Sequence, residues 1–323
     1  MSGEAFASSL AVFLVAILIA GAALGIAVMP SLFAILPNDL ERYRTILHAL
    51  ATTNPRIVVF GDSRGAAGID CRQLTSEIEG HPLALNLSAH GVGLPDVLLL
   101  MQEVPASARL VVVVMGRDRF AVNQFPDLSY NVLFMYGYRP DADTRRDIGD
   151  AFGAEEGRRI DRPPIAEILA SRWTVRQAAD MLVRDAMRGR KARLSERDDL
   201  FLPIIYERRL DRRRFAAALS LLRRESITHA SMDSTSQILL RRIARTAARK
   251  HQRVLLVLAP ADPGALDRQP LSPFSDPKSI ANVSVLDATS LLGDTDFADP
   301  LHPTPAGARK LTSFVARGIE ALP

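Results

Sequence analysis

Short apolar runs alternate with longer amphipathic stretches along most of the chain. In Leu110–Met115, β-branched residues follow one another without a polar break, which is typical of a strand buried on both faces of a sheet. Apolar runs predict four further strands, at Ile57–Phe60, Leu83–Leu87, Val254–Leu258 and Val283–Leu286. Helical patterns lie between and around them, at Asp39–Thr53, Pro95–Gln102, Ser234–Lys250 and Pro305–Leu322. Strands that alternate with helices indicate an α/β fold, with a parallel sheet covered by helices on both faces.

The stretch Arg139–Thr235 interrupts this alternation. It is rich in Arg, Asp and Glu, and it has amphipathic helical patterns around Ile165–Met187 and Phe215–Leu222. We therefore expect a helical insertion at about 139–235, between the third and fourth strands. A solvated lid and a docking surface for a partner or polymer are both open as its role.

The amino-terminal segment is apolar and uncharged. No charged residue occurs between Glu4 and Asp39, and Ala, Val, Leu, Ile and Phe dominate Leu10–Leu36. About 20 apolar helical residues cross a bilayer core, so we predict one transmembrane anchor in residues 1–38 and one α/β domain over 39–323. A cleaved signal peptide would begin with a positive region. The first ten residues contain no Lys or Arg, which favours an uncleaved anchor.

Flanking charge does not decide on which side of the membrane the domain lies. Arg42 and Arg44 follow the predicted span and only Glu4 precedes it, which by the positive-inside rule favours the cytoplasm. Asp39 and Glu41 in the same segment oppose this bias, and large domains can cross a membrane regardless of flanking charge. Both orientations stay open on this evidence.

Composition excludes several classes of protein. Of the 323 residues, 48% are hydrophobic and 24% are charged, which is ordinary for a folded protein and excludes wholesale disorder. The single cysteine, Cys71, excludes an intrachain disulfide framework and a cysteine-rich metal site. The arginines are interleaved with acidic residues in a chain of net charge +4, so we expect no nucleic-acid partner. Because no metal-ligand spacing and no glycine-rich phosphate loop occur, we predict no metal and no other cofactor.

Two polar segments near opposite ends of the chain carry candidate chemistry. Gly61-Asp62-Ser63 directly follows the first predicted strand, and residues 299–302, Asp-Pro-Leu-His, precede the last helix. Ligands of α/β proteins bind outside the carboxyl ends of parallel strands. A serine nucleophile needs a base, most often histidine, and the histidine needs a carboxylate to fix its tautomer. Together the two segments predict such a set, although each alone is also compatible with a turn serine or a surface histidine.

In their order and strand context, these segments resemble the SGNH/GDSL hydrolase superfamily. The resemblance covers roughly Arg56–Arg117 and Arg245–Leu322, and it includes a glycine, Gly307, in the helix after the histidine. It implies a flavodoxin-like three-layer α/β/α fold that performs acyl-ester chemistry. The catalytic residues that it implies are Ser63 as nucleophile, His302 as base and Asp299 as the acid that orients the base.

Two further family segments differ here from the family pattern. Residues 86–91 read Asn-Leu-Ser-Ala-His-Gly where the family has an Asn-Leu-Gly-like segment, so the resemblance assigns the oxyanion hole to backbone N–H groups of Ser63 and of Ser88 or Gly91. Residues 116–119 read Gly-Arg-Asp-Arg where the family has Gly-x-Asn-Asp. Asp118 cannot donate a hydrogen bond when ionised. Loss of one such donor lowers the rate by about 10²–10³, which argues against efficient simple hydrolysis.

Two residues beside these segments are candidates for substrate binding. Arg64 follows the predicted nucleophile and could attract an anionic sugar, and His90 lies in the predicted oxyanion segment. A solvated arginine and a surface histidine are the alternatives.

The anchor, the altered third segment and the insertion are together similar to an envelope-polymer acylation branch of the superfamily, which includes alginate O-acetylation and teichoic-acid D-alanylation proteins. This similarity implies an esterase or O-acyltransferase acting on O-acetyl groups of a cell-envelope or exported polysaccharide. It also implies a membrane-bound O-acyltransferase or polysaccharide synthase as partner. The domain would then lie outside the cytoplasmic membrane, anchored by a single span, and hydrolysis and transfer both stay open.

Two other functions also stay open. The domain could be a non-catalytic accessory of a polysaccharide synthesis or acylation complex, which Asp118 favours and the intact set of Ser63, Asp299 and His302 opposes. It could also be a lipase or thioesterase that faces the cytoplasm, which a reporter fused at the carboxyl terminus would test.

Overall fold

The computed structural model describes residues 39–120, 125, 130, 133–134, 137–160, 200–204, 210–226, 234–262, 264 and 280–322. The membrane span predicted within residues 1–38 lies outside this part of the chain. Among the described residues, no helix has both the length and the apolar character needed to cross a bilayer.

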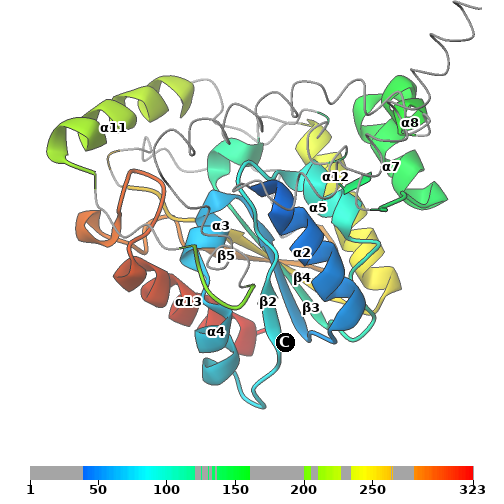
Figure 1. Ribbon diagram of the computed structural model, residues 1–323, viewed down its shortest axis with the longest axis horizontal. Coiled ribbons are helices and arrows are strands. Elements are labelled where there is room, and N and C mark those ends of the chain that lie inside the picture. The colour runs from blue at the N-terminus through cyan, green and yellow to red at the C-terminus, as the bar shows by residue number, and fades with distance from the viewer. Residues whose placement is uncertain are drawn as a thin grey trace, which may run out of the picture.

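The described residues contain one parallel sheet of five strands (Figure 1). The strands are β1 (Ile57–Gly61), β2 (Ala84–Asn86), β3 (Leu110–Met115), β4 (Arg253–Leu258) and β5 (Val283–Asp287). They pair in the order β2-β1-β3-β4-β5, and every pair is parallel. The predicted α/β fold with a parallel sheet is confirmed, and each predicted strand lies within one residue of its expected bounds.

Helices cover both faces of this sheet, as Figure 1 shows. The helices on one face are α2 (Asp39–Thr52), α5 (Leu94–Leu100) and α12 (Ser234–Arg249). They contribute Ile46, Leu98 and Leu239 to a hydrophobic cluster that also contains Phe60 of β1 and Val113 of β3. These helices therefore bury one set of alternating strand positions.

The other face of the sheet packs against α4 (Cys71–Glu77) and α13 (Pro305–Glu320), which lie beside the short helix α3 (Ser63–Gly68). A second hydrophobic cluster joins Leu74 of α4 and Leu311 of α13 to Val59 and Val112 of the sheet. Because both sets of alternating positions are buried, the strands read in the sequence as continuous apolar runs.

The strand order changes direction at β1. The strand β2 lies on one side of β1, whereas β3, β4 and β5 lie on the other. Such a reversal opens a crevice outside the carboxyl ends of the two strands that flank it, and this is where doubly wound α/β proteins bind ligands. Here those strands are β1 and β3, which are followed by Ser63 and by the short 3₁₀ helix η1 (Arg117–Phe120).

The described parts of the stretch between β3 and β4 include helices. They are α7 (Ala142–Phe152), α8 (Ala154–Arg159) and α11 (Arg212–Ser226). The helical pattern expected around Phe215–Leu222 lies in α11, whereas the pattern around Ile165–Met187 falls outside the described residues. The salt bridge between Arg242 and Asp147, 2.8 Å long, joins α12 to α7.

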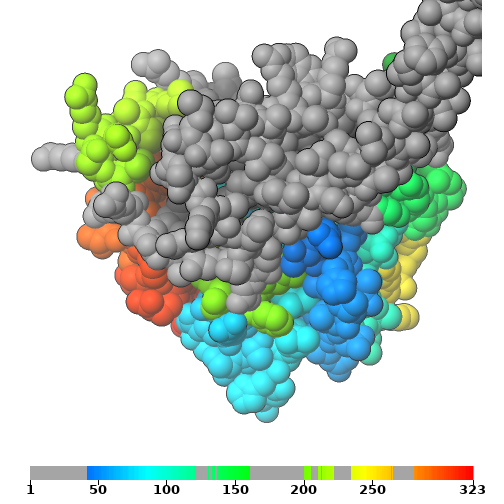
Figure 2. Space-filling view, in the orientation of Figure 1, coloured from blue at the N-terminus to red at the C-terminus, as the bar shows by residue number. Residues whose placement is uncertain are grey.

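One segment of this stretch, residues 200–204, packs against the outer edge of the sheet. The Asn86 N–H donates to the Leu200 carbonyl at 2.7 Å, the Cys71 N–H donates to the Phe201 carbonyl, and the Ile204 N–H donates to the Ala66 carbonyl. In Figure 2 the lime-green atoms of this segment lie against cyan atoms from the first third of the chain. The segment therefore satisfies one backbone group of the edge strand β2, the Asn86 N–H, and backbone groups of α3 and α4.

Candidate active site

The turn between β1 and α3 places Ser63 at the carboxyl edge of the sheet. Gly61 ends β1 so close to β3 that a Cβ atom there would lie 2.2 Å from the Val114 carbonyl oxygen. Asp62 then caps α3, because its Oδ1 atom accepts from the Arg64 N–H at 2.9 Å. Ser63 is the first residue of the helix and is half-buried. The turn thus holds Ser63, at the start of a short capped helix, in the crevice beside β3.

The loop before α13 brings an acid and a histidine together. The Oδ1 atom of Asp299 accepts from the backbone N–H groups of Leu301 and His302, at 2.9 and 3.0 Å. The Ala298 N–H donates to the His302 carbonyl at 2.9 Å, which closes the loop. The side chains of Asp299 and His302 therefore leave the loop on the same side.

The two segments predicted to carry chemistry meet in the structure. The Nδ1 atom of His302 lies 2.7 Å from Oδ2 of Asp299, and its Nε2 atom lies 2.8 Å from Oγ of Ser63. A carboxylate that accepts from Nδ1–H leaves the lone pair of Nε2 free to accept from the serine hydroxyl. The contacts are thus those of a nucleophile, a base and an orienting acid.

The Asp299 carboxyl remains ionised in this setting. Partial burial opposes its charge, but hydrogen bonds from the His302 ring and from the backbone N–H groups of Leu301 and His302 outweigh burial. The pKa of Asp299 therefore lies below its ordinary value. An ionised Asp299 can stabilise an imidazolium when His302 takes up a proton.

The predicted oxyanion donors differ in their availability. The Ser88 N–H donates to the Asn86 Oδ1 atom at 3.1 Å, and Ser88 is fully buried, so the structure does not offer this N–H to a substrate. No described residue accepts a hydrogen bond from the N–H of Ser63 or of Gly91. Gly91 is exposed, and its φ of +75° favours glycine. Ser63 and Gly91 therefore remain as the candidates.

Arg64 does not lie where an anionic sugar could reach it. Its side chain is buried, with Nη2 at 2.7 Å from both Asp62 Oδ2 and Asp118 Oδ1. The guanidinium packs over Gly116, where a Cβ atom would come within 1.8 Å of it. The structure thus contradicts the expectation that Arg64 binds substrate, because two carboxylates already satisfy its charge.

This ion pair also changes the interpretation of Asp118. Sequence reasoning treated Asp118 as a lost hydrogen-bond donor, whereas the structure shows that its carboxylate forms an ion pair with a buried cation. Arg119 lies beside the same group, with its Nε atom 3.7 Å from Asp62 Oδ2 and 3.9 Å from Asp118 Oδ2. Two acidic and two basic side chains next to Ser63 thus balance one another's charge; they are Asp62, Asp118, Arg64 and Arg119.

Burial and charge act in opposite directions on this cluster. Burial disfavours the charge of Asp62, but attraction to Arg64 and Arg119 outweighs it, and the pKa of Asp62 is lowered. Burial likewise disfavours the charge of Arg64, but Asp62 and Asp118 raise its pKa. Both partners therefore stay charged at neutral pH. Sequence reasoning missed Asp62 and Arg119, since neither has a motif that marks it as half of an ion pair.

His90 lies at the predicted site. Its ring centroid is 6.3 Å from that of His302, and the two rings meet edge to face. His90 is half-buried, so part of its surface is open to the space beside the base. Contact with a substrate stays a prediction for this residue.

The described residues hold no group of three or more His, Cys, Asp or Glu side chains arranged to bind a metal ion.

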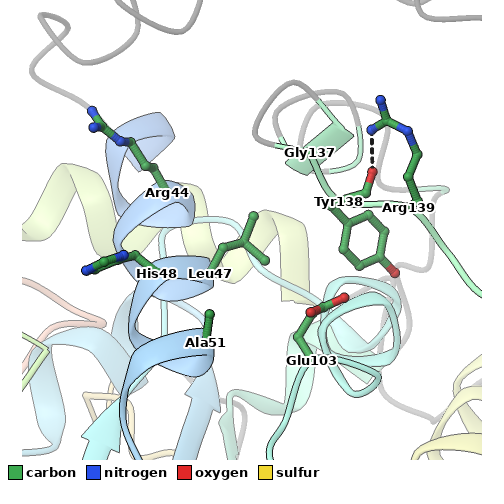
Figure 3. A pocket seen from close by; sticks show the side chains of 8 residues that line it. All are labelled: Arg44, Leu47, His48, Ala51, Glu103, Gly137, Tyr138 and Arg139. Carbon is green, nitrogen blue, oxygen red and sulfur yellow. Dashed lines mark hydrogen bonds between the residues drawn. The ribbon is translucent and has the colours of Figure 1, made fainter.

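A cavity of about 590 Å³ lies on another part of the described structure, between α2 and residues 137–139 (Figure 3). Its lining residues are Arg44, Leu47, His48, Ala51, Glu103, Gly137, Tyr138 and Arg139. None of them comes from the segments that contain Ser63 or His302, so the cavity is not the space in front of the nucleophile.

Comparisons with known proteins leave the family of this chain open. No protein-family model and no curated protein matches it. Among the solved structures with some similarity is one provisionally described as a platelet activating factor from Streptococcus pneumonia. The two are 10% identical with a TM-score of 0.39, over 92% of this chain and 99% of the other. A likeness this distant supports no inference about function.

Proposed function

We propose that the protein is a serine acyl-ester enzyme of the SGNH type, with Ser63, His302 and Asp299 as its catalytic residues. The observation that carries this proposal is the unbroken chain of contacts from Asp299 Oδ2 through the His302 ring to Ser63 Oγ. The two hydrogen-bond lengths are within the range that proton transfer from a serine hydroxyl requires.

The topology supports the same proposal. The order β2-β1-β3-β4-β5 is the flavodoxin-like arrangement of a doubly wound sheet, and helices lie on both faces. Ser63 follows β1 at the point where the strand order reverses. A flavodoxin-like three-layer α/β/α fold with its nucleophile at this position is what the resemblance to the superfamily implies.

The geometry suggests the following reaction. The Oγ atom of Ser63 attacks the acyl carbonyl while its proton passes to Nε2 of His302, and Asp299 stabilises the imidazolium. Backbone N–H groups of Ser63 and Gly91 hold the oxyanion. The alcohol leaves with the proton from His302, and an acyl ester on Ser63 remains. Water or a sugar hydroxyl, deprotonated by His302, then attacks this ester and regenerates the serine.

For the substrate we propose O-acetyl groups of a cell-envelope or exported polysaccharide. This step rests on the similarity of the sequence to envelope-polymer acylation proteins and on the apolar segment in residues 1–38. Under this proposal the protein spans the cytoplasmic membrane once, and its domain lies on the outer side. The partner would be a membrane-bound O-acyltransferase or a polysaccharide synthase.

The deciding experiment is turnover of p-nitrophenyl acetate, together with acetate release from an acetylated polysaccharide, by the full chain in detergent. Ser63→Ala and His302→Ala should each lower kcat by about 10³-fold or more. Ser76→Ala is the matched control, because Ser76 is an exposed serine on α4. Equal rates for the wild type and Ser63→Ala would contradict the proposed function.

One observation favours a second function, that of a non-catalytic accessory in a polysaccharide complex. Asp118 stands where the superfamily has an amide donor, and its carboxylate is engaged with Arg64. An accessory would not react with a fluorophosphonate probe at Ser63, and Ser63→Ala would keep full function in the cell. Labelling of Ser63 that is lost in His302→Ala would instead support the enzyme.

A further inference from the structure

A buried arginine on α2 reaches the segment that precedes the candidate oxyanion donor. The side chain of Arg42 is 3% exposed. Its Nη2 atom donates to the Asn86 carbonyl at 2.9 Å, and its Nε atom donates to the Ser88 carbonyl at 2.5 Å. One planar guanidinium thus holds two carbonyls that are two residues apart.

The first of these carbonyls, that of Asn86, ends the edge strand β2, and Ser88 follows that strand. The strand β2 has β1 on one side only, so its outward backbone groups lack a strand partner. The Asn86 N–H donates to the Leu200 carbonyl, and the Asn86 carbonyl accepts from Arg42. Arg42 and Leu200 therefore supply the hydrogen bonds that a neighbouring strand would supply.

The inward groups of the same segment bind β1. The Leu87 N–H donates to the Val59 carbonyl at 2.7 Å, and the Ala89 N–H donates to the Gly61 carbonyl at 3.1 Å. The peptide group between Ser88 and Ala89 is thus fixed at both ends, its carbonyl by Arg42 and its N–H by Gly61. Gly61 lies two positions before Ser63, so this hydrogen bond ties the peptide group to the turn that carries the nucleophile.

The residues that follow this peptide group are His90, whose ring lies beside that of His302, and Gly91, the remaining candidate oxyanion donor of the segment. We infer that Arg42 is a positioning residue of the acyl-transfer site, which holds residues 86–91 so that the Gly91 N–H faces the oxyanion formed at Ser63. This inference rests on the proposed function. Under this inference, α2 helps to set the geometry of the site. This helix begins directly after the predicted membrane segment.

The test compares Arg42→Met and Arg42→Lys with Arg44→Met in the full chain. Arg44 lies on the same helix and is exposed, so its variant controls for the loss of a positive charge from α2. Turnover of p-nitrophenyl acetate is measured per Ser63 that a fluorophosphonate can titrate, so that misfolded protein does not count. The inhibition constant of phenylboronic acid, which forms a tetrahedral adduct with a serine, is measured beside KM.

Arg42→Met should lower kcat by about 10- to 100-fold, because an oxyanion donor is displaced. It should weaken phenylboronic acid by a similar factor and change KM by less than about threefold, because KM reports mainly ground-state binding. Arg42→Lys should be intermediate, since an ammonium can reach one of the two carbonyls, and it carries the test if Arg42→Met does not fold. Arg44→Met should match the wild type.

Three results would overturn the inference. In the first, both Arg42 variants melt at a lower temperature but keep the wild-type kcat per titratable serine. In the second, KM rises while kcat and phenylboronic acid binding stay unchanged. The third is turnover that does not depend on Ser63, which overturns the proposed function as well, whereas the first two overturn only the role of Arg42.

Discussion

Arg64 and Asp118 form an ion pair with 2.7 Å between Nη2 and Oδ1, which links the residue after the candidate nucleophile to the 3₁₀ helix η1 after β3. The Arg64 side chain is 3% exposed and the Asp118 side chain is 35% exposed. Asp62, the second partner of Arg64, is almost completely buried. Loss of the shared cation should therefore be far more damaging than loss of the more exposed acid.

The first prediction concerns this asymmetry. Arg64→Met should lower the free energy of unfolding by about 3–5 kcal/mol, because it leaves the buried Asp62 carboxylate without its hydrogen-bonded cation. Asp118→Ala should cost only about 1 kcal/mol, since Arg64 keeps Asp62 and Asp118 is partly solvated. Urea denaturation of the full chain in detergent measures both values. Equal losses would contradict the view that Asp62 is the dominant partner.

The second prediction concerns Gly116. A Cβ atom at this position would lie 1.8 Å from the Arg64 guanidinium, so Gly116→Ala should displace Arg64 from its two carboxylates. In Arg64→Ala the obstacle is gone, and the same substitution should then cost much less. A double-mutant cycle should show a coupling of about 1–3 kcal/mol. Additive losses would mean that Gly116 is required for another reason.

The third prediction concerns the acid that orients the base. Asp299→Asn keeps an oxygen that can accept from the N–H groups of Leu301 and His302, so the loop should stay folded. Its amide would donate to Nδ1, which moves the ring proton to Nε2 and removes the acceptor for Ser63. We expect kcat to fall by about 10³–10⁴ with little change in KM, and the melting temperature to fall only modestly, because the charge of Asp299 is lost while its loop contacts are kept. A loss of activity that only follows unfolding would contradict this assignment.

Much of the fold and the meeting of two distant segments follow from the sequence by simple rules. A run such as Leu110–Met115 predicts a strand buried on both faces, and the carboxyl ends of parallel strands share one edge of the sheet. These rules place Ser63, Asp299 and His302 near one another before any coordinates are known. Their catalytic roles stay predictions until activity is measured.

The partners of single polar groups do not follow from the sequence. Arg64 pairs with an acid 54 positions away, and the Ser88 N–H is taken by the side chain of Asn86. Sequence reasoning predicted the helix that contains Arg42 but used Arg42 itself only for its charge. Each contact depends on side-chain directions that are fixed by packing, which neither hydrophobic periodicity nor a motif encodes.

The fourth prediction concerns pH. The pKa values of Asp62 and Asp299 are lowered on folding from an ordinary value of 3.8, so these carboxyls take up protons more readily in the unfolded chain. Their contribution to stability is fully present above pH 4–5 and is lost as the pH falls below about 4, toward the folded-state pKa values. Urea denaturation at pH 7, 5 and 3 should show little change between the first two and a marked loss at the third. In Asp62→Asn the same series should be shallower below pH 4, because one of the two groups no longer titrates. An identical slope in wild type and variant would show that folding does not lower the pKa of Asp62.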